Sequence, residues 1–334
     1  MKEKKLISIL AYLMIFVLMV CSVYASQSPV SLGTAQGYAI VAKTAISDTN
    51  PSISAVVGNV TLDPAAGSFI TGLSCTRMAG KIIENNAGYL GGFDTNTSCA
   101  IVNATTSLAV ESDMETAYLD ARGRTGVNTT ELGSGEIGTL TITPGLYKWS
   151  TPVTISNDVT LNCGGNASAV YIFQISQTLG ISNGKKVILA GSCDPANIFW
   201  QVDTGATLGT TSEFKGTILA GTAITLNSGA AVNGRLFAQS AVTLGGSALA
   251  IPGEAVPVIV LPSTTPPAAV DKGTSPGAIL LALGRLGRGN VIDASGQSAT
   301  TTQPSLASWI EANRLLVLIG LGLLVWWLVT KKKK

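Results

Sequence analysis

Apolar and polar positions repeat along the middle of the chain with a period of 18 residues. Three segments align at this offset: residues 197–209, 215–227 and 233–245. Each begins with an apolar strand, passes a polar corner and ends in a short strand containing Thr-Leu. A unit this short cannot bury its own apolar side, so we predict that the copies stack as rungs of a parallel β-solenoid. Eighteen residues suit three short strands per rung, which predicts a coil of triangular section.

Within the repeats, a period of two separates inward from outward side chains. The inward positions are apolar, namely Ala206, Ile224, Val242, Leu208, Leu226 and Leu244. The outward positions are Thr207, Thr225 and Thr243, preceded by the small residues Gly205, Ala223 and Ala241 and by the corner residues Thr204, Thr222 and Ser240. Rungs lie about 4.8 Å apart, so these residues are expected to form a flat, uncharged surface. The alternative is an ordinary solenoid face, because threonine suits strands in general.

One segment follows a helical pattern instead. From Ser107 to Arg122 the apolar residues fall on one stripe, which predicts an amphipathic helix over about residues 105–122. The stripe consists of Leu108, Val110, Met114, Ala117, Tyr118 and Ala121. Such a helix would cover one face of the solenoid. Residues 70–104, rich in Gly and Asn, are expected to cap a solenoid end.

Both ends of the chain carry membrane signals. Residues 1–25 have a basic start, an apolar core and a small-residue cleavage site, which predicts a secretory signal peptide. Residues 309–330 include a long apolar run, and the lysine tail 331–334 follows, which is typical of a transmembrane helix with a cytoplasmic tail. A buried soluble helix is the alternative for this run. We therefore expect a cell-surface protein whose domain lies outside the membrane.

A stalk is predicted between the domain and the membrane. Residues 253–308 are rich in Pro, Thr, Ser and Ala, whereas the solenoid pattern is confined to residues 26–252. A random coil of this length reaches about 40 Å, enough to hold the domain off a membrane. Residues 278–293 include an apolar stretch to which the sequence assigns no role.

The composition excludes several kinds of chemistry. The chain has no histidine, so Ser-His-Asp hydrolysis and His-ligated zinc are ruled out. A polysaccharide-active enzyme would need clustered carboxylates, whereas Asp158, Asp194, Asp203 and Glu213 are scattered singly. No CxxC pair offers a zinc site. We predict no enzyme activity, no metal and no cofactor.

Charge is sparse and unevenly placed. Only 12% of the residues are charged, against 46% hydrophobic. The formal charge of +2 arises from the ends, because residues 26–330 contain 14 basic and 18 acidic side chains, a balance of −4. No basic face is available for nucleic acid, and nucleic-acid binding is not expected.

Cysteine and asparagine patterns fit an exported protein. Four cysteines remain after signal removal, and the neighbour pairs Cys75–Cys99 and Cys163–Cys193 are the simplest of three pairings. Five Asn-x-Ser/Thr sites are compatible with glycosylation, although chance explains several in a chain rich in these residues; they begin at Asn59, Asn96, Asn103, Asn128 and Asn166.

Ordered segments resemble the widespread microbial ice-binding protein family over about residues 31–252. They include residues 31–35, 38–47, 58–64 and 71–73, then 113–118, 144–149, 172–175, 197–202, 216–220 and 234–236. The resemblance implies a discontinuous right-handed parallel β-solenoid of triangular section, a long helix packed along one face, and adsorption to ice through a flat face. Some members carry Thr-Ala/Gly-x-Thr/Asn on neighbouring rungs of that face.

This sequence carries closely similar motifs. They are Thr204-Gly-Ala-Thr207, Thr222-Ala-Ile-Thr225 and Ser240-Ala-Val-Thr243, with Ser in place of Thr at the start of the third. The nine ice-binding candidates are therefore Thr204, Gly205, Thr207, Thr222, Ala223, Thr225, Ser240, Ala241 and Thr243. The face could extend to Thr44, Ser47, Thr154, Thr160 and Thr178, which lie at comparable outward positions.

The leading hypothesis is a monomeric, surface-anchored ice-binding protein whose partners are ice crystals and, through its helix, the membrane. The alternative is an adhesin or glycan-binding module without ice activity. Trp149 and Trp200 could then stack on sugars, although each lies in an apolar strand and core packing is the simpler interpretation. A purely structural surface stalk is the remaining option.

Overall fold

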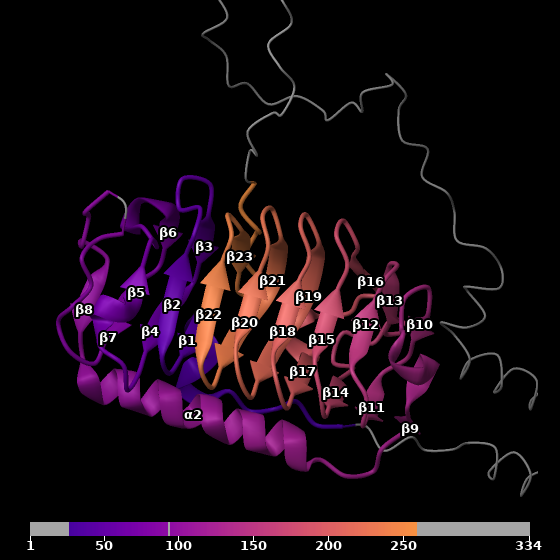
Figure 1. The fold of residues 1–334 in the computed structure, drawn as a ribbon. Helices are drawn as coiled ribbons and strands as arrows, with labels where there is room; N and C mark the ends of the chain where they lie inside the picture. Colours follow the sequence, from indigo (N-terminus) through magenta and orange to yellow (C-terminus); the bar gives the residue numbers. More distant parts are fainter. Residues whose placement is uncertain (1–26, 93, 259–334) are drawn as a thin grey trace, which may run out of the picture. The chain divides into compact units, whose positions relative to one another are not determined.

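Strands form where apolar residues alternate with small polar ones, and each pairs in parallel with a strand one rung away. The computed structural model describes residues 27–92 and 94–258. These residues form three sheets and one α-helix, stacked as a solenoid (Figure 1). The predicted mainly β architecture with parallel strands and one helix is confirmed.

The largest sheet is the helix-covered sheet, whose outer side faces α2 (Ala104–Gly123). Its order is β8 (Ala100–Val102), β7 (Ile82–Glu84), β4 (Asn59–Leu62), β1 (Tyr38–Ala42), β21 (Ala231–Ala238), β19 (Glu213–Ala220), β17 (Ile198–Val202), β14 (Tyr171–Ile175), β11 (Gly145–Trp149) and β9 (Thr129–Thr130). A branch from β21 adds β23 (Ala248–Ala250), β3 (Ala55–Val57) and β6 (Met78–Ala79).

The seven-stranded sheet runs along a second face. Its order is β12 (Val153–Ile155), β15 (Leu179–Ile181), β18 (Ala206–Leu208), β20 (Ile224–Leu226), β22 (Ala241–Leu244), β2 (Ala45–Asp48) and β5 (Ile70–Thr71). The three-stranded sheet comprises β10 (Thr141–Ile142), β13 (Val159–Asn162) and β16 (Val187–Ala190). Short 3-10 helices lie at η1 (Gly33–Gly37), η2 (Gly67–Phe69), η3 (Cys75–Arg77), η4 (Leu132–Gly135) and η5 (Pro195–Asn197).

The third face combines the three-stranded sheet with the β21 branch. Strands β19 and β21 are long because each crosses a corner, at Gly216 and Gly234, which are partners in register. A Cβ on Gly234 would collide with the carbonyl oxygen of Gly216, so only glycine fits at this close approach. An isolated bridge from Lys186 to Glu213 joins the two parts of this face.

Stacking order and chain order differ. Strand β1 pairs with β4 on one side and with β21 on the other, so the first rung adjoins the last. Helix α2 returns the chain from β8 at one end of the solenoid to β9 at the other (Figure 1). The solenoid is therefore discontinuous in sequence.

Apolar side chains fill the space between the three sheets. Phe173 and Trp200 stack with ring centroids 4.0 Å apart, and Trp149 continues the aromatic column. Trp149 and Trp200 are fully buried, and their indole N–H groups donate to the carbonyls of Leu132 and Lys215. Both tryptophans are core residues, so neither is a platform for sugar stacking.

A second apolar layer joins α2 to the helix-covered sheet. Val110, Met114 and Ala117 are among its buried residues. The helix spans Ala104–Gly123, one residue more at each end than predicted, and the Asn103 side chain caps it by accepting the Thr106 N–H at 3.0 Å.

One position of the predicted helical stripe is wrong. Leu108 is 59% exposed, whereas Ser107 is buried and shares a 2.8 Å hydrogen bond with the hydroxyl of Thr61. The helix is therefore rotated so that this polar contact, and not Leu108, faces the sheet.

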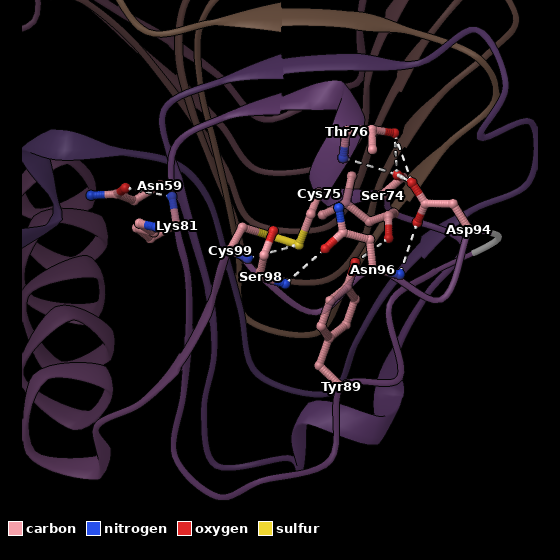
Figure 2. Close-up of a disulfide and its surroundings, with 11 residues drawn as sticks. Asn59, Ser74, Cys75, Thr76, Lys81, Tyr89, Asp94, Asn96, Ser98 and Cys99 are labelled. Atoms are coloured by element: carbon pink, nitrogen blue, oxygen red, sulfur yellow. Dashed lines mark hydrogen bonds between the residues drawn. A yellow bond between two sulfur atoms is a disulfide. The ribbon is translucent and has the colours of Figure 1, made fainter.

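The segment 70–104 contains strands of the solenoid as well as irregular turns. Cys75–Cys99 and Cys163–Cys193 are the disulfides formed, which are the neighbour pairs. Beside the first, the Asp94 carboxylate accepts hydrogen bonds from the hydroxyls of Ser74 and Thr76 (Figure 2). Disulfide and carboxylate together tie irregular backbone to the end of the solenoid.

The last described residues leave the fold at the corner between the third face and the helix-covered sheet. The Ile251 N–H donates to the Val57 carbonyl, and the Asn233 side chain donates to the Glu254 carbonyl. Within residues 27–92 and 94–258, no helix has the length and apolar character to cross a membrane. The predicted signal peptide 1–25, the transmembrane segment 309–330, the lysine tail and most of the stalk lie outside the described residues.

We expect Gln174→Leu to destabilise the fold. The buried Gln174 amide N–H donates to the carbonyls of Ala121, Arg122 and Arg124 at 2.9–3.0 Å, which holds the C-terminal end of α2 on the sheet. Unpairing such carbonyls costs about 1–3 kcal/mol in the free energy of unfolding, measurable by denaturant titration. Gln177→Leu is the control, because Gln177 is exposed and donates to one carbonyl. An equal loss of unfolding free energy in both variants would contradict this role of Gln174.

Candidate functional site

A single row of outward residues crosses the whole seven-stranded sheet. Register pairs connect Thr154 to Gly180, Gly180 to Thr207, Thr207 to Thr225, Thr225 to Thr243, Thr243 to Ser47, and Ser47 to Thr71. We call these seven residues the hydroxyl row. Six of the seven carry a hydroxyl, and none carries a charge.

The predicted alternation of side chains holds at the centre of this row. The six inward residues of β18, β20 and β22 that were predicted to be core are all buried. Thr207 is exposed, and Thr225 and Thr243 are half-buried between their neighbours. Parallel pairing repeats the same side chain about every 4.8 Å, which produces a flat ladder of methyl and hydroxyl groups.

Two further rows adjoin the hydroxyl row. Gly205, Ala223 and Ala241 precede it and are half-buried. The corner row contains Thr204, Thr222, Ser240 and Thr44, linked by backbone hydrogen bonds of 3.0 Å (Thr222 to Thr204), 3.3 Å (Ser240 to Thr222) and 3.0 Å (Thr44 to Ser240). The structure thus brings all nine predicted residues together along one face.

Thr204 differs from the other corner residues. Its Oγ1 atom is buried without a hydrogen-bond partner among the described residues, whereas Thr222 is exposed. Thr204 therefore contributes its backbone to the ladder but does not present its hydroxyl at the surface.

The structure places four of the five residues of the predicted extension along this face and the fifth on another sheet. Ser47 and Thr154 belong to the hydroxyl row, Thr44 belongs to the corner row, and Thr178 directly precedes β15. Thr160 lies on β13 of the three-stranded sheet, paired with Thr141 and Ile188. Its rung turns a corner after Ser156, so Thr160 faces a different direction and cannot extend this face.

Gly180 and Thr71 are the members of the row that the sequence did not indicate, and Thr71 is the one of the two that carries a hydroxyl. It lies on β5, a strand of only two residues, and is exposed. A strand this short carries no alternation that a pattern could detect. The one available signal was its place after Ile70, whose inward side chain pairs in register with Ile46.

Charged side chains are held away from the central strands of this face. Lys43, next to the corner row, extends to Glu111 at 2.5 Å and Glu115 at 2.8 Å on α2. Lys186 and Glu213 pair at 2.6 Å on the third face. Among the strands described for the seven-stranded sheet, the one ionisable residue is Asp48, which is buried, and burial raises its pKa.

A carboxylate marks one end of the hydroxyl row. Glu136 forms an isolated bridge with Thr154 and accepts its hydroxyl at 2.9 Å. The hydroxyl of Thr154 is therefore committed to Glu136, and the uncharged part of the row begins at Gly180.

The three faces of the solenoid differ in how exposed and how charged their outer surfaces are. Helix α2 and the N-terminal segment cover the outer side of the helix-covered sheet. The third face carries the Lys186–Glu213 ion pair and the 40% exposed Ile188. The seven-stranded sheet is the face that combines exposure, regular register and lack of charge.

The carboxylates of Asp203 and Asp194 form contacts that stabilise the fold. Asp203 contacts Arg122 at 3.0 Å and Tyr118 at 3.1 Å, while Asp194 caps η5. In the part of the chain that the structure describes, no three Cys, Asp or Glu side chains are grouped to hold a metal ion. The outer face of the seven-stranded sheet is therefore a broad surface suited to recognition.

Fold and face together define a class of protein, a β-solenoid that presents one flat, hydroxyl-bearing surface. Residues 40–250 match the model of the ice-binding-like family. This chain belongs to that family.

Relatives and solved structures agree with this assignment. The chain is 42% identical over 206 residues to an ice-binding protein of Colwellia sp., covering 61% of this chain and 77% of the relative. It is 40% identical to ice-binding protein K1-A of Typhula ishikariensis, covering 63% and 85%. The structure of an antifreeze-active ice-binding protein from an Arctic yeast superimposes with a TM-score of 0.59 at 32% identity, covering 70% of this chain and 98% of the other. These relatives and this solved structure are all ice-binding proteins.

Glu136 should make stability depend on pH at the end of the row. Burial raises its pKa, but hydrogen bonds from Ser156, Gly138 and Thr154 outweigh burial and hold the pKa below its ordinary value of 4.5. Its stabilising effect is then complete above pH 4.5 and is lost as the pH falls through the lowered value.

The test compares the free energy of unfolding of the wild type and Glu136→Gln across that pH range. The difference between them should shrink as the solution is acidified. Glu254→Gln serves as the control, because its exposed carboxylate has no hydrogen-bond partner among the described residues. A difference that stays constant with pH would contradict the role of the carboxylate charge.

Proposed function

We propose that this protein binds ice through the outer face of the seven-stranded sheet. The observation that supports the proposal most strongly is the hydroxyl row, an uninterrupted register of small uncharged residues from Gly180 to Thr71. Family membership supports the same function, since the relatives and solved structures above are ice-binding proteins.

Ice recognition requires an ordered layer of water and no reactive group. Hydroxyls spaced about 4.8 Å apart can hold water at repeated positions, while the adjacent methyl groups limit competing hydration. A charged side chain would orient water against the ice lattice. The ion pairs of Lys43 with Glu111 and Glu115 on the helix side keep this cation off the face.

The rigid backbone of this face allows many weak contacts with ice to act together. The backbone of the face is fixed by ladder hydrogen bonds on both sides of each central strand, so little further entropy is lost on adsorption. Ser47 and Thr243 are joined directly by a 3.2 Å hydroxyl hydrogen bond. We place the most effective part of the surface at Thr207, Thr225, Thr243 and Ser47, away from Glu136.

We propose further that a monomer is exported and held at the cell surface. The basis is the sequence, with a signal peptide at 1–25, a stalk at 253–308 and a transmembrane segment at 309–330. An anchored ice-binding domain would attach a cell to ice or shape ice near its envelope. A retained anchor argues against a freely dispersed antifreeze.

A bulky residue in the middle of the face should abolish most of the activity. Thr225→Tyr raises a ring above the plane, so we expect thermal hysteresis to fall severalfold while the unfolding midpoint changes little. Thr160→Tyr is the matched control, since it makes the same change on the three-stranded sheet and should keep full hysteresis. Equal hysteresis in both variants would move ice binding to another face.

Anchoring has its own test. Deleting residues 309–334 should shift the domain from the membrane fraction to the medium when cells are fractionated. Deleting residues 268–293, the same number from the stalk, should leave it in the membrane fraction. Recovery of the full chain in the medium would show that residues 309–330 do not anchor it.

A further inference from the structure

A polar hollow of about 270 Å³ lies at the C-terminal end of α2, over the outer side of the helix-covered sheet. The polar residues of its lining are Arg122, Lys148, Gln174, Ser176, Gln201 and Asp203. Lys148, Gln174 and Gln201 are partners in register on β11, β14 and β17. None of the lining residues belongs to the hydroxyl row or to the two rows beside it.

The Gln174 amide presents its oxygen to this hollow. Its Nε2 donates to the carbonyls of Ala121, Arg122 and Arg124, so a flipped amide would place oxygen against oxygen. Oε1 therefore points away from these carbonyls. It accepts no hydrogen bond within the described part of the chain and is not enclosed by protein, although the residue is only 4% exposed. The small exposed part of Gln174 thus includes an acceptor that opens into the hollow.

The Asp203 carboxylate offers a second acceptor. Its Oδ1 atom receives all the contacts, from Arg122 Nε at 3.0 Å, the Tyr118 hydroxyl at 3.1 Å and Gln201 Nε2 at 2.9 Å. Oδ2 has no hydrogen-bond partner among the residues that the structure describes, and a quarter of the side chain is exposed. The negative end of the α2 dipole lies on the same side. This side of the hollow therefore favours a cationic group with N–H donors.

The other side of the hollow is cationic. Lys148 and Gln201 flank Gln174 on opposite sides, and Lys148 is exposed, with no hydrogen bond or ion pair from its ammonium in residues 27–92 and 94–258. Lys148 and Arg122 would repel a simple cation, whereas Asp203 Oδ2 would repel a simple anion. A molecule that carries both charges complements both sides.

The size and lining of the hollow restrict the ligand further. Ile175 is its one apolar lining residue, and no aromatic ring lines it. The flat face of a sugar would find no stacking platform here, and a large apolar group would find little surface to contact. The ligand that fits is small and polar apart from its two charges.

We propose that this hollow binds a small α-amino acid in its zwitterionic form. The ammonium donates to Gln174 Oε1 and Asp203 Oδ2, and the carboxylate accepts a hydrogen bond from the Lys148 ammonium. Gln174 also holds the C-terminal end of α2 on the sheet, so the ligand binds beside the attachment of the helix. This site is independent of the surface on which we place ice binding.

Equilibrium dialysis of radiolabelled glycine against the purified full-length chain tests the proposal. We expect saturable binding of one glycine per chain. Radiolabelled glycinamide lacks the carboxylate and radiolabelled N-acetylglycine lacks the ammonium, so each should bind at least tenfold more weakly. Non-saturable binding of glycine, or binding of either analogue as tight as that of glycine, would overturn the proposal.

Two variants at exposed positions locate the site without disturbing the core. Lys148→Met removes the cation and should weaken glycine binding at least fivefold, whereas Lys81→Met, at another exposed lysine, should bind as the wild type does. Ser176→Phe fills the hollow and should weaken binding at least tenfold, with Ser112→Phe on the exposed side of α2 as its matched control. Wild-type affinity in Lys148→Met or Ser176→Phe, or an equal loss in the controls, would place glycine elsewhere and refute this assignment.

Discussion

The pairing of β1 with β21 is the interaction on which the continuous outer face depends. It aligns Ile40, Val41 and Ala42 with Leu236, Phe237 and Ala238, and so places the first rung beside the last. The ten strands from β8 to β9 extend about 43 Å at about 4.8 Å a step. Helix α2, 20 residues long, covers about 30 Å of the return path, and the extended residues 124–128 cover about 16 Å more. This return path lets the first rung pair with the last. Without it, the hydroxyl row would break between Thr243 and Ser47.

The scarcity of charge in the composition has a definite place in the structure. Ion pairs at Lys43 with Glu111, Arg122 with Asp203, and Lys186 with Glu213 lie on the helix side or on the third face. The exposed outer positions of the seven-stranded sheet need no such pairs because they carry only hydroxyls, methyls and backbone. The ion pairs that stabilise the fold and the uncharged outer face of the seven-stranded sheet therefore lie on different sides of the solenoid.

The sequence predicted the centre of the site better than its ends. An 18-residue repeat is visible where each rung has the same length, so the outward positions of Thr207, Thr225 and Thr243 follow from alternation alone. Thr160 lies off this face because its rung is longer and its strand begins after the corner that follows β12. Thr71 was missed because a two-residue strand has no period, and its neighbour Ser47 is 24 residues away. The pocket lined by Leu32, Asn197 and Arg235 could not be predicted, since tertiary packing assembles it from three separate segments.

The way in which the chain leaves the solenoid has a mechanical consequence. Strand β23, the last strand of the described residues, is hydrogen-bonded to β21 on one side and to β3 on the other, so it belongs to a central rung and not to a terminal one. A force applied at the carboxyl end of the domain would have to break both ladders of β23 before any rung is released. A rung at the end of the stack would peel from one neighbour only. The discontinuous order of the chain therefore places the carboxyl end of the domain where the solenoid resists tension best.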